Sequence, residues 1–171
     1  MSWSSGSAAL LLLLGLGLGG CGFRPLYARP DTPGSVPASL AGIEVDEIKS
    51  RSGFMVRDRL LDLISPSGPP GQPHYKLTVT LNETESALGI QGNETVTSYD
   101  FHLDAHFFLR EQPSNKVVFD GRARSIANYS VVTSQFATLS AQRDAADRAS
   151  RALAEDIATR LSIWADEHRK Q

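Results

Sequence analysis

The sequence is poor in the residue types that build disulfide frameworks and common metal sites. Cysteine occurs once in 171 residues, as Cys21, and histidine occurs four times. A single cysteine excludes an intrachain disulfide and a metal site built from several thiolates. Neither sign of charge dominates, since 17 Lys and Arg oppose 19 Asp and Glu for a net charge of -2. The chain lacks the positive field that attracts nucleic acid, so we expect no nucleic-acid partner.

Catalytic sequence motifs are also missing. The sequence contains no G-x-S-x-G, no H-E-x-x-H and no G-x-x-x-x-G-K, so no motif points to an enzyme and we expect no cofactor. One triplet leaves an alternative open. His102, Asp104 and His106 occupy alternate positions of a predicted strand, about 7 Å apart, a spacing at which two imidazoles and a carboxylate can share Zn²⁺. A solvated polar face explains the same residues without a metal.

The N-terminal region contains one apolar run, Ala8 to Leu18. A bilayer-spanning helix needs about 20 apolar residues, so this shorter run predicts the hydrophobic region of a signal peptide. The following Leu18-Gly19-Gly20-Cys21 resembles the lipobox of bacterial lipoproteins, in which the chain is cut before the cysteine and the thiol carries acyl chains such as palmitate. We predict a signal peptide in residues 1–20 and a lipid on Cys21. Residues 21–40 are rich in proline and predict an extended tether.

The remaining residues, 41–171, predict a single α+β domain. Strict alternation of apolar and polar residues predicts strands with one buried face, and three-to-four spacing predicts helices. The expected order is strand-helix-strand-strand-strand-helix, with strands at 43–48, 75–90, 97–110 and 116–128 and helices at 54–64 and 138–168. The economical packing is a two-layer sandwich: a four-stranded, largely antiparallel sheet with two helices on one face.

Several details of these elements are predicted as well. Ser52 or Gly53 is expected at the N-terminus of the first helix, and Ser65-Pro66 at its end. The alternation breaks at 83–86 and predicts a bulge there, Gly121 predicts a second bulge, and 91–93 predicts a hairpin turn. Predicted core residues are the aromatic residues Tyr99, Phe101 and Phe107, then Val117, Phe119 and Ala123 of the last strand, and the helical stripe Ala146, Ala149, Leu153, Ile157, Leu161 and Trp164.

The last strand also carries a basic pair. Arg122 and Arg124 share one strand face, near Arg110 and Lys116 if the hairpin pairs as expected. Such a cluster suits phosphate or carboxylate groups, which a guanidinium meets with two parallel hydrogen bonds. The alternative is that these cations neutralise nearby carboxylates, namely Asp100, Asp104 and Asp120.

Three stretches of sequence carry a resemblance to a known family. They are CGFRPLY at 21–27, YKLTVTLNETESALGIQ at 75–91, and the segment 127–161 that begins ANYSVVTSQFATLS. Together they resemble the LPS-assembly lipoprotein family LptE, especially its alphaproteobacterial members. Family members often have a basic residue where Ser98 stands here, so the candidates for LPS contact in this chain are Arg110, Lys116, Arg122 and Arg124.

The resemblance implies a non-catalytic lipoprotein, lipid-anchored in the outer membrane, that plugs and helps assemble the LptD β-barrel and supports insertion of lipopolysaccharide. Its implied partners are an LptD-type barrel, lipopolysaccharide and the membrane that holds the lipid anchor. Two other functions are compatible with the residues. One is an auxiliary lipoprotein of an ABC-type transport system, and the other is an anchored metal-dependent hydrolase that uses the histidine triplet.

Overall fold

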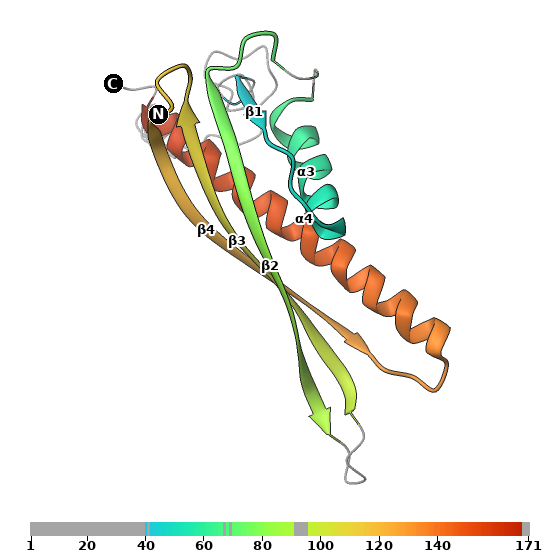
Figure 1. The fold of residues 1–171 in the computed structure, drawn as a ribbon. Helices are drawn as coiled ribbons and strands as arrows, with labels where there is room; N and C mark the ends of the chain where they lie inside the picture. The colour runs from blue at the N-terminus through green and yellow to red at the C-terminus, as the bar shows by residue number, and fades with distance from the viewer. Residues whose placement is uncertain (1–39, 41, 67, 69, 91–95, 169–171) are drawn as a thin grey trace, which may run out of the picture.

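The computed structural model describes residues 40, 42–66, 68, 70–90 and 96–168 (Figure 1). The predicted signal peptide, Cys21, nearly all of the tether and the turn at 91–93 lie outside these residues. The elements are β1 (Ile43–Val45), α3 (Arg51–Ile64), β2 (Tyr75–Ile90), β3 (Val96–Glu111), β4 (Val117–Ser130) and α4 (Gln135–His168). The predicted α+β class and element order are confirmed.

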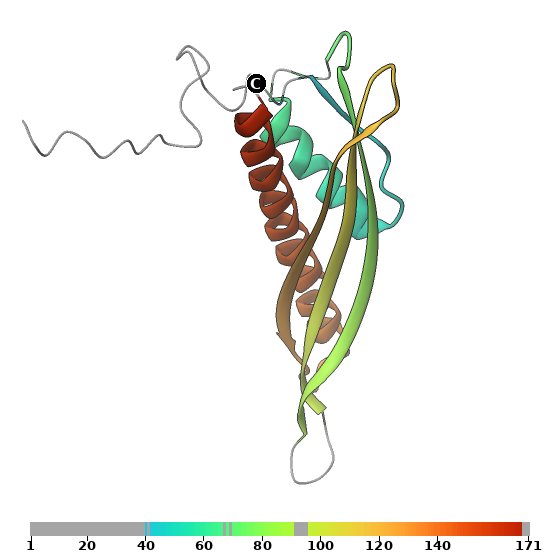
Figure 2. The ribbon, with the colours of Figure 1, turned by 90° about the vertical axis from the view of Figure 1, so that its left-hand side faces the viewer.

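The four strands form one sheet in the order β1-β2-β3-β4. β1 runs parallel to β2, while β2, β3 and β4 are antiparallel neighbours. Figure 2 shows α3 and α4 together on one side of the sheet, with α4 running along most of its length. The result is the predicted two-layer sandwich, and no helix of the described residues covers the other side of the sheet. None of the helices in the described residues combines the length and the apolar character needed to cross a bilayer.

The core lies between the sheet and the two helices. Alternate strand residues such as Leu77, Leu103 and Phe107 are fully buried, as are Leu153 and Ile157 of α4. The buried surface of α4 also contains several alanines and two serines, whose small side chains let the helix approach its neighbours closely. The predicted helical stripe is confirmed, except that Ala145 is fully buried and Ala146 is only half-buried.

Both helices begin earlier than predicted. α3 starts at Arg51, and its N-cap is Ser50, whose Oγ accepts from the Gly53 amide at 3.0 Å. Ser52 and Gly53 are buried inside the helix instead of capping it. A Cβ on Gly53 would lie 2.6 Å from the Ile48 carbonyl oxygen, so this position accepts only glycine without a shift of the backbone. α4 starts three residues early because Ser134 caps it: its carbonyl accepts from Thr138 N and its hydroxyl from Ala137 N. The predicted end of α3 is confirmed, since Ser65 is its C-cap.

The two predicted bulges are wrong, for different reasons. β2 pairs regularly with β3 from Glu83 to Ser86, and the irregularity lies at Ala87–Ile90. The apolar alternation stops at 83 because both faces of β2 become exposed there, so no face selects for apolar residues. Gly121 pairs regularly with Phe107, and its missing side chain leaves the space that the Phe107 ring fills.

The first residues of β4 are less buried than predicted. Val117 is 40% exposed, whereas Phe119 is half-buried and Ala123 is buried as expected. A register irregularity between Leu109 and Arg110 separates Val117 from the regular ladder. The aromatic residues predicted for the core do pack there. The ring centroids of Phe107 and Phe119 are 5.9 Å apart, and the half-buried Tyr99 stacks on Tyr129 with 5.6 Å between ring centroids.

Candidate binding face of the sheet

The side of the sheet opposite the helices is a polar surface, called here the open face. It is formed by even-numbered residues of β2, β3 and β4, which the register places in rows. The rows run Lys76–Arg110, Thr78–Phe108–Asp120, Thr80–His106–Arg122, Asn82–Asp104–Arg124 and Thr84–His102–Ile126. Every predicted charged candidate on the strands therefore lies on a surface that no described helix covers.

A hollow of about 640 Å³ lies over the middle rows. Its polar lining includes Asp104, His106, Arg122 and Arg124 from the strands. Asp156 and Arg160 of α4 line it as well, so the hollow extends past the outer edge of β4 towards the helix layer. Three arginines and two aspartates thus border one concave surface, and the excess of positive charge favours anionic groups.

Arg122 and Arg124 differ in their partners. Arg124 Nε donates to Asp104 Oδ1 across the strands, and the two side chains are 66% and 33% exposed. Among the described residues, Arg122 makes no ion pair and no side-chain hydrogen bond. Asp120, two residues before Arg122 on β4, pairs with His106 Nε2 at 3.0 Å. Neutralisation by local carboxylates, the alternative stated above, therefore holds for Arg124 and not for Arg122.

The structure separates the other two candidates from this pair. Arg110 lies opposite Lys76, four residues along β3 from His106, or about 13 Å away. Its guanidinium carbon is 6.0 Å from the centre of the Phe108 ring. Lys116 lies in the turn before β4, where its carbonyl accepts from Glu111 N, and its side chain is exposed. The open face therefore has two basic groups, Arg122/Arg124 and Lys76/Arg110, instead of the single predicted cluster.

Two cations of this surface were not identified from the sequence. Lys76 forms an ion pair with Asp46 at 2.9 Å, and this hydrogen-bonded partner raises the pKa of the lysine. The alternation of residues in β2 indicates which face of the sheet Lys76 occupies. Its position opposite Arg110, however, follows only from the register between β2 and β3. Arg160 is a helix residue that reaches the hollow only because α4 lies beside β4, which no local pattern reveals.

The histidine triplet is divided among different partners. His102 Nε2 lies 2.9 Å from Ser86 Oγ, His106 bonds Asp120, and Asp104 bonds Arg124. In the part of the chain that the structure describes, no group of three His, Cys, Asp or Glu residues is arranged to hold a metal ion. The zinc alternative, and the hydrolase that depends on it, has no geometric support in these residues.

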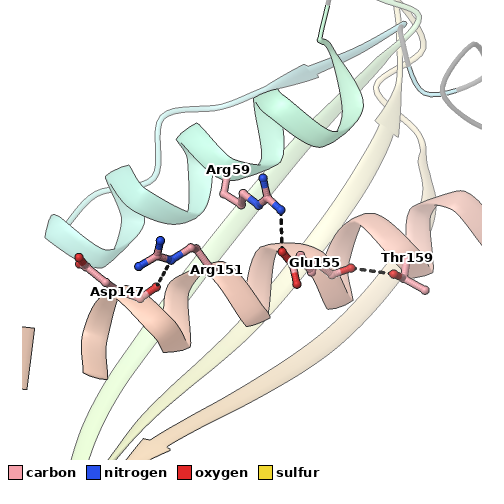
Figure 3. A network of polar contacts seen from close by, with 5 residues as sticks. All are labelled: Arg59, Asp147, Arg151, Glu155 and Thr159. Carbon is pink, nitrogen blue, oxygen red and sulfur yellow. Dashed lines mark hydrogen bonds and ion pairs between the residues drawn. The ribbon is translucent and has the colours of Figure 1, made fainter. Parts of the chain in front are cut away.

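A second polar network joins the two helices on the far side of the molecule. Figure 3 shows Arg59 of α3 bonded to Glu155 of α4, at 2.7 Å between Nη2 and Oε1. Arg151 Nε donates to the Asp147 carbonyl rather than to its carboxylate. The i,i+4 ion pairs Asp144/Arg148 and Asp156/Arg160 are both present. Of these contacts, only Arg59–Glu155 joins α3 to α4, and the others lie within α4. Each contributes little because the side chains are exposed.

One tyrosine, buried between the sheet and the helices, has a raised pKa. Burial and the neighbouring Glu85 carboxylate raise the pKa of Tyr129 from 10.0 to about 12. A raised pKa means that the fold favours the neutral phenol. Its contribution to stability is complete below pH 10 and is lost as the pH rises from 10 to 12.

We expect Tyr129→Phe to lose less stability than the wild type over that range. Urea denaturation at pH 9, 11 and 12 measures this; parallel losses in both proteins would contradict it.

The fold defines a class: a two-layer α+β domain shared with bacterial lipoproteins of solved structure. Residues 40–161 match the family LptE, described as lipopolysaccharide-assembly, and the chain belongs to that family. A lipoprotein from Caulobacter crescentus CB15 has the same fold with a TM-score of 0.65 and 24% identity, covering 76% of this chain and 95% of that one.

Two further solved structures share the fold. Rare lipoprotein B from Shewanella oneidensis superposes with a TM-score of 0.54 at 13% identity, over 70% of this chain and 91% of that one. Lipoprotein B from Nitrosomonas europaea has a TM-score of 0.54 at 12% identity, over 82% and 90% of the two chains. The comparison with curated proteins returns no match. At these identities the solved structures establish the fold, and the family match establishes the membership in the lipopolysaccharide-assembly family.

Proposed function

We propose that this protein is an outer-membrane lipoprotein of the lipopolysaccharide translocon, which occupies the lumen of an LptD-type β-barrel, helps the barrel assemble and binds lipopolysaccharide. The observation that carries the proposal is the family match over residues 40–161. The resemblance to LptE at 21–27, before the matched region, supports the same function. No catalytic step is part of this role.

The surface chemistry of the domain supports a position inside a barrel. The lumen of an outer-membrane barrel is polar, so a domain that fills it needs an exterior of mixed charge more than an apolar patch. The open face meets this requirement, with Asp104, His106, Arg122 and Arg124 within two adjacent rows. The elongated shape of the sheet-and-helix layers in Figures 1 and 2 is compatible with insertion along a barrel axis.

Attachment to the membrane is the second part of the proposal. Signal peptidase cleavage before Cys21 removes residues 1–20, and acylation of the thiol and of the new amine adds two to three chains. One acyl chain binds a membrane only marginally, whereas two or more hold a protein there stably. Residues 21–39 then serve as the tether between the outer membrane and the folded domain. The tether is one residue shorter than predicted, because Leu40 is buried in the core of the domain.

A purification from its own membranes tests this function. We expect a C-terminally tagged chain, solubilised from outer membranes in detergent, to co-purify with an LptD-type barrel. We also expect its N-terminal peptide to begin at Cys21 and to carry acyl mass by mass spectrometry. Co-purification with inner-membrane ATPase subunits instead would favour the auxiliary lipoprotein of an ABC-type transporter. An unmodified cysteine would contradict the anchor.

Lipopolysaccharide binding makes a prediction for the open face. Lipid A phosphates suit the guanidinium groups of Arg122 and Arg124. We expect Arg122→Ala/Arg124→Ala to lower the affinity for lipopolysaccharide about tenfold and to weaken its salt dependence. Of the single variants, Arg122→Ala should have the larger effect because Arg124 already pairs with Asp104. Arg51→Ala, an exposed position on α3 behind the sheet, is the matched control. Titrations with lipopolysaccharide at two salt concentrations measure the affinity and its salt dependence. Equal affinities of the double variant and the wild type would show that these arginines have a structural role only.

A further inference from the structure

β4 forms one edge of the sheet, and in the described residues no strand pairs with its outer side (Figure 1). Just after β4, Val131 N donates to Thr97 O at 2.9 Å, which assigns the ladder bonds with β3 to the odd-numbered residues. The main-chain groups of the even-numbered residues therefore point away from β3. The Asn128 carbonyl agrees with this direction, because it accepts from Arg148 Nη2 on the helix side at 2.9 Å.

Three consecutive outward positions of this edge have main-chain groups without partners. No hydrogen bond within the described part of the chain reaches the outward N–H and C=O groups of Arg122, Arg124 and Ile126. The opposite edge of the sheet differs. β1 covers the start of β2, and the segment that follows continues beside it, with Asp46 N bonded to Leu77 O and Ser50 Oγ bonded to Glu83 Oε1. Within the described residues, no such segment runs beside β4 from Arg122 to Ile126, so the sheet can extend at this edge.

Charge identifies the kind of chain that fits this edge. Arg122 and Arg124 project from its open-face side, and Arg148 and Arg160 approach it from α4. Each guanidinium carries five donors, and the single carboxylate partners of Arg124, Arg148 and Arg160 leave several donors available. A second copy of this chain fits poorly, because pairing β4 with itself around Arg124 places arginines opposite one another.

We propose that the β4 edge receives an extended, acidic segment of a partner protein by strand addition. The segment's main chain bonds the outward groups of Arg122, Arg124 and Ile126, and its carboxylates meet the flanking arginines. Main-chain bonds supply the affinity, while the arginines select a segment with Asp or Glu at alternate positions. This interaction goes beyond the proposed function, because lipopolysaccharide contact uses the side chains of the open face and not the main chain of β4.

A designed peptide tests strand addition directly. The probe is a blocked nonapeptide that alternates Glu and Val, titrated into the isotope-labelled, purified full chain. We expect binding that slows hydrogen exchange of the Arg122, Arg124 and Ile126 amides at least about tenfold. Of two analogues N-methylated at alternate amides, the one that blocks the bonds to β4 should lose binding. Absence of binding, binding without protection of these amides, or equal binding of both analogues would overturn the proposal.

A variant pair isolates the main-chain contribution. Ile126→Pro removes one outward N–H, leaves both arginines in place and keeps the ladder bonds to β3. Ile126→Ala retains the N–H and serves as the matched control. We expect the proline variant to bind the peptide at least about tenfold more weakly than the alanine variant. Its affinity for lipopolysaccharide should be unchanged, so failure of strand addition and failure of the lipopolysaccharide proposal give different results. If the proline variant does not fold, the N-methylated peptides decide the question with the wild-type chain.

Discussion

Leu153→Ala is expected to lower the free energy of unfolding by about 2 to 5 kcal/mol. Leu153 is fully buried in the middle of α4, within the core between the helices and the sheet. Several of its neighbours on the buried side of α4 are alanines or serines, which cannot extend into the space left by the missing leucine side chain. The cavity should therefore stay open, which places the expected cost above the transfer free energy of the deleted carbons alone. Urea denaturation of the purified protein measures the difference.

The matched control lies on the same helix. Arg148 is 48% exposed in its side chain, pairs with Asp144 one turn away and donates to the exposed Asn128 carbonyl of β4. Exposed ion pairs contribute little, so Arg148→Ala should change stability by less than about 1 kcal/mol. A loss at Arg148 equal to that at Leu153 would mean that the buried side of α4 is not the one identified here.

Gly121→Ala is expected to destabilise the fold by about 1 to 3 kcal/mol through overpacking. The three heavy atoms closest to an added Cβ all belong to the Phe107 ring, and Cε2 would lie only 2.8 Å from it. That ring is fully buried and packs on Phe119, so it has no free space to move into. In an open strand position the same change gains up to about 1 kcal/mol, because alanine loses less backbone freedom than glycine. The collision therefore determines the sign.

Gly71→Ala provides the comparison for the glycine prediction. A Cβ at Gly71 meets no heavy atom within 4 Å, so we expect a stability change within about 0.5 kcal/mol of zero. Thermal unfolding followed by circular dichroism compares the two variants. A Gly121→Ala protein as stable as the wild type would show that β4 shifts away from Phe107 at little cost.

Much of the fold follows from local patterns in the sequence. The alternation from Tyr99 to Leu109 predicts a strand with one buried face, and the structure buries that face from Phe101 onwards. The spacing of Leu153, Ile157 and Leu161 likewise predicts the buried side of α4. Such patterns are reliable because a residue's distance along a strand or helix alone decides which face it occupies.

Some of the mistaken details have a local cause, and others depend on groups distant in the sequence. The start of α3 has a local cause: Ser50 Oγ accepts from the Gly53 amide, so the cap lies two residues before Ser52. The role of Gly121 depends on Phe107, fourteen positions earlier, and not on a local kink. Glu83 to Ser86 look irregular only because that end of β2 has no buried face.

The sequence by itself determined the class of the fold, the order of its elements, the family resemblance and three of the cations on the open face, Arg110, Arg122 and Arg124. Only the tertiary structure decided how those charges are grouped. Cross-strand register pairs Arg124 with Asp104, leaves Arg122 without a carboxylate, and sets Lys76 beside Arg110. The packing of α4 beside the sheet places Arg148 and Arg160 near the uncovered edge of β4. The physical reason is that periodicity sets which face a side chain occupies, whereas its neighbours across strands and layers depend on register and packing, which the whole chain determines together.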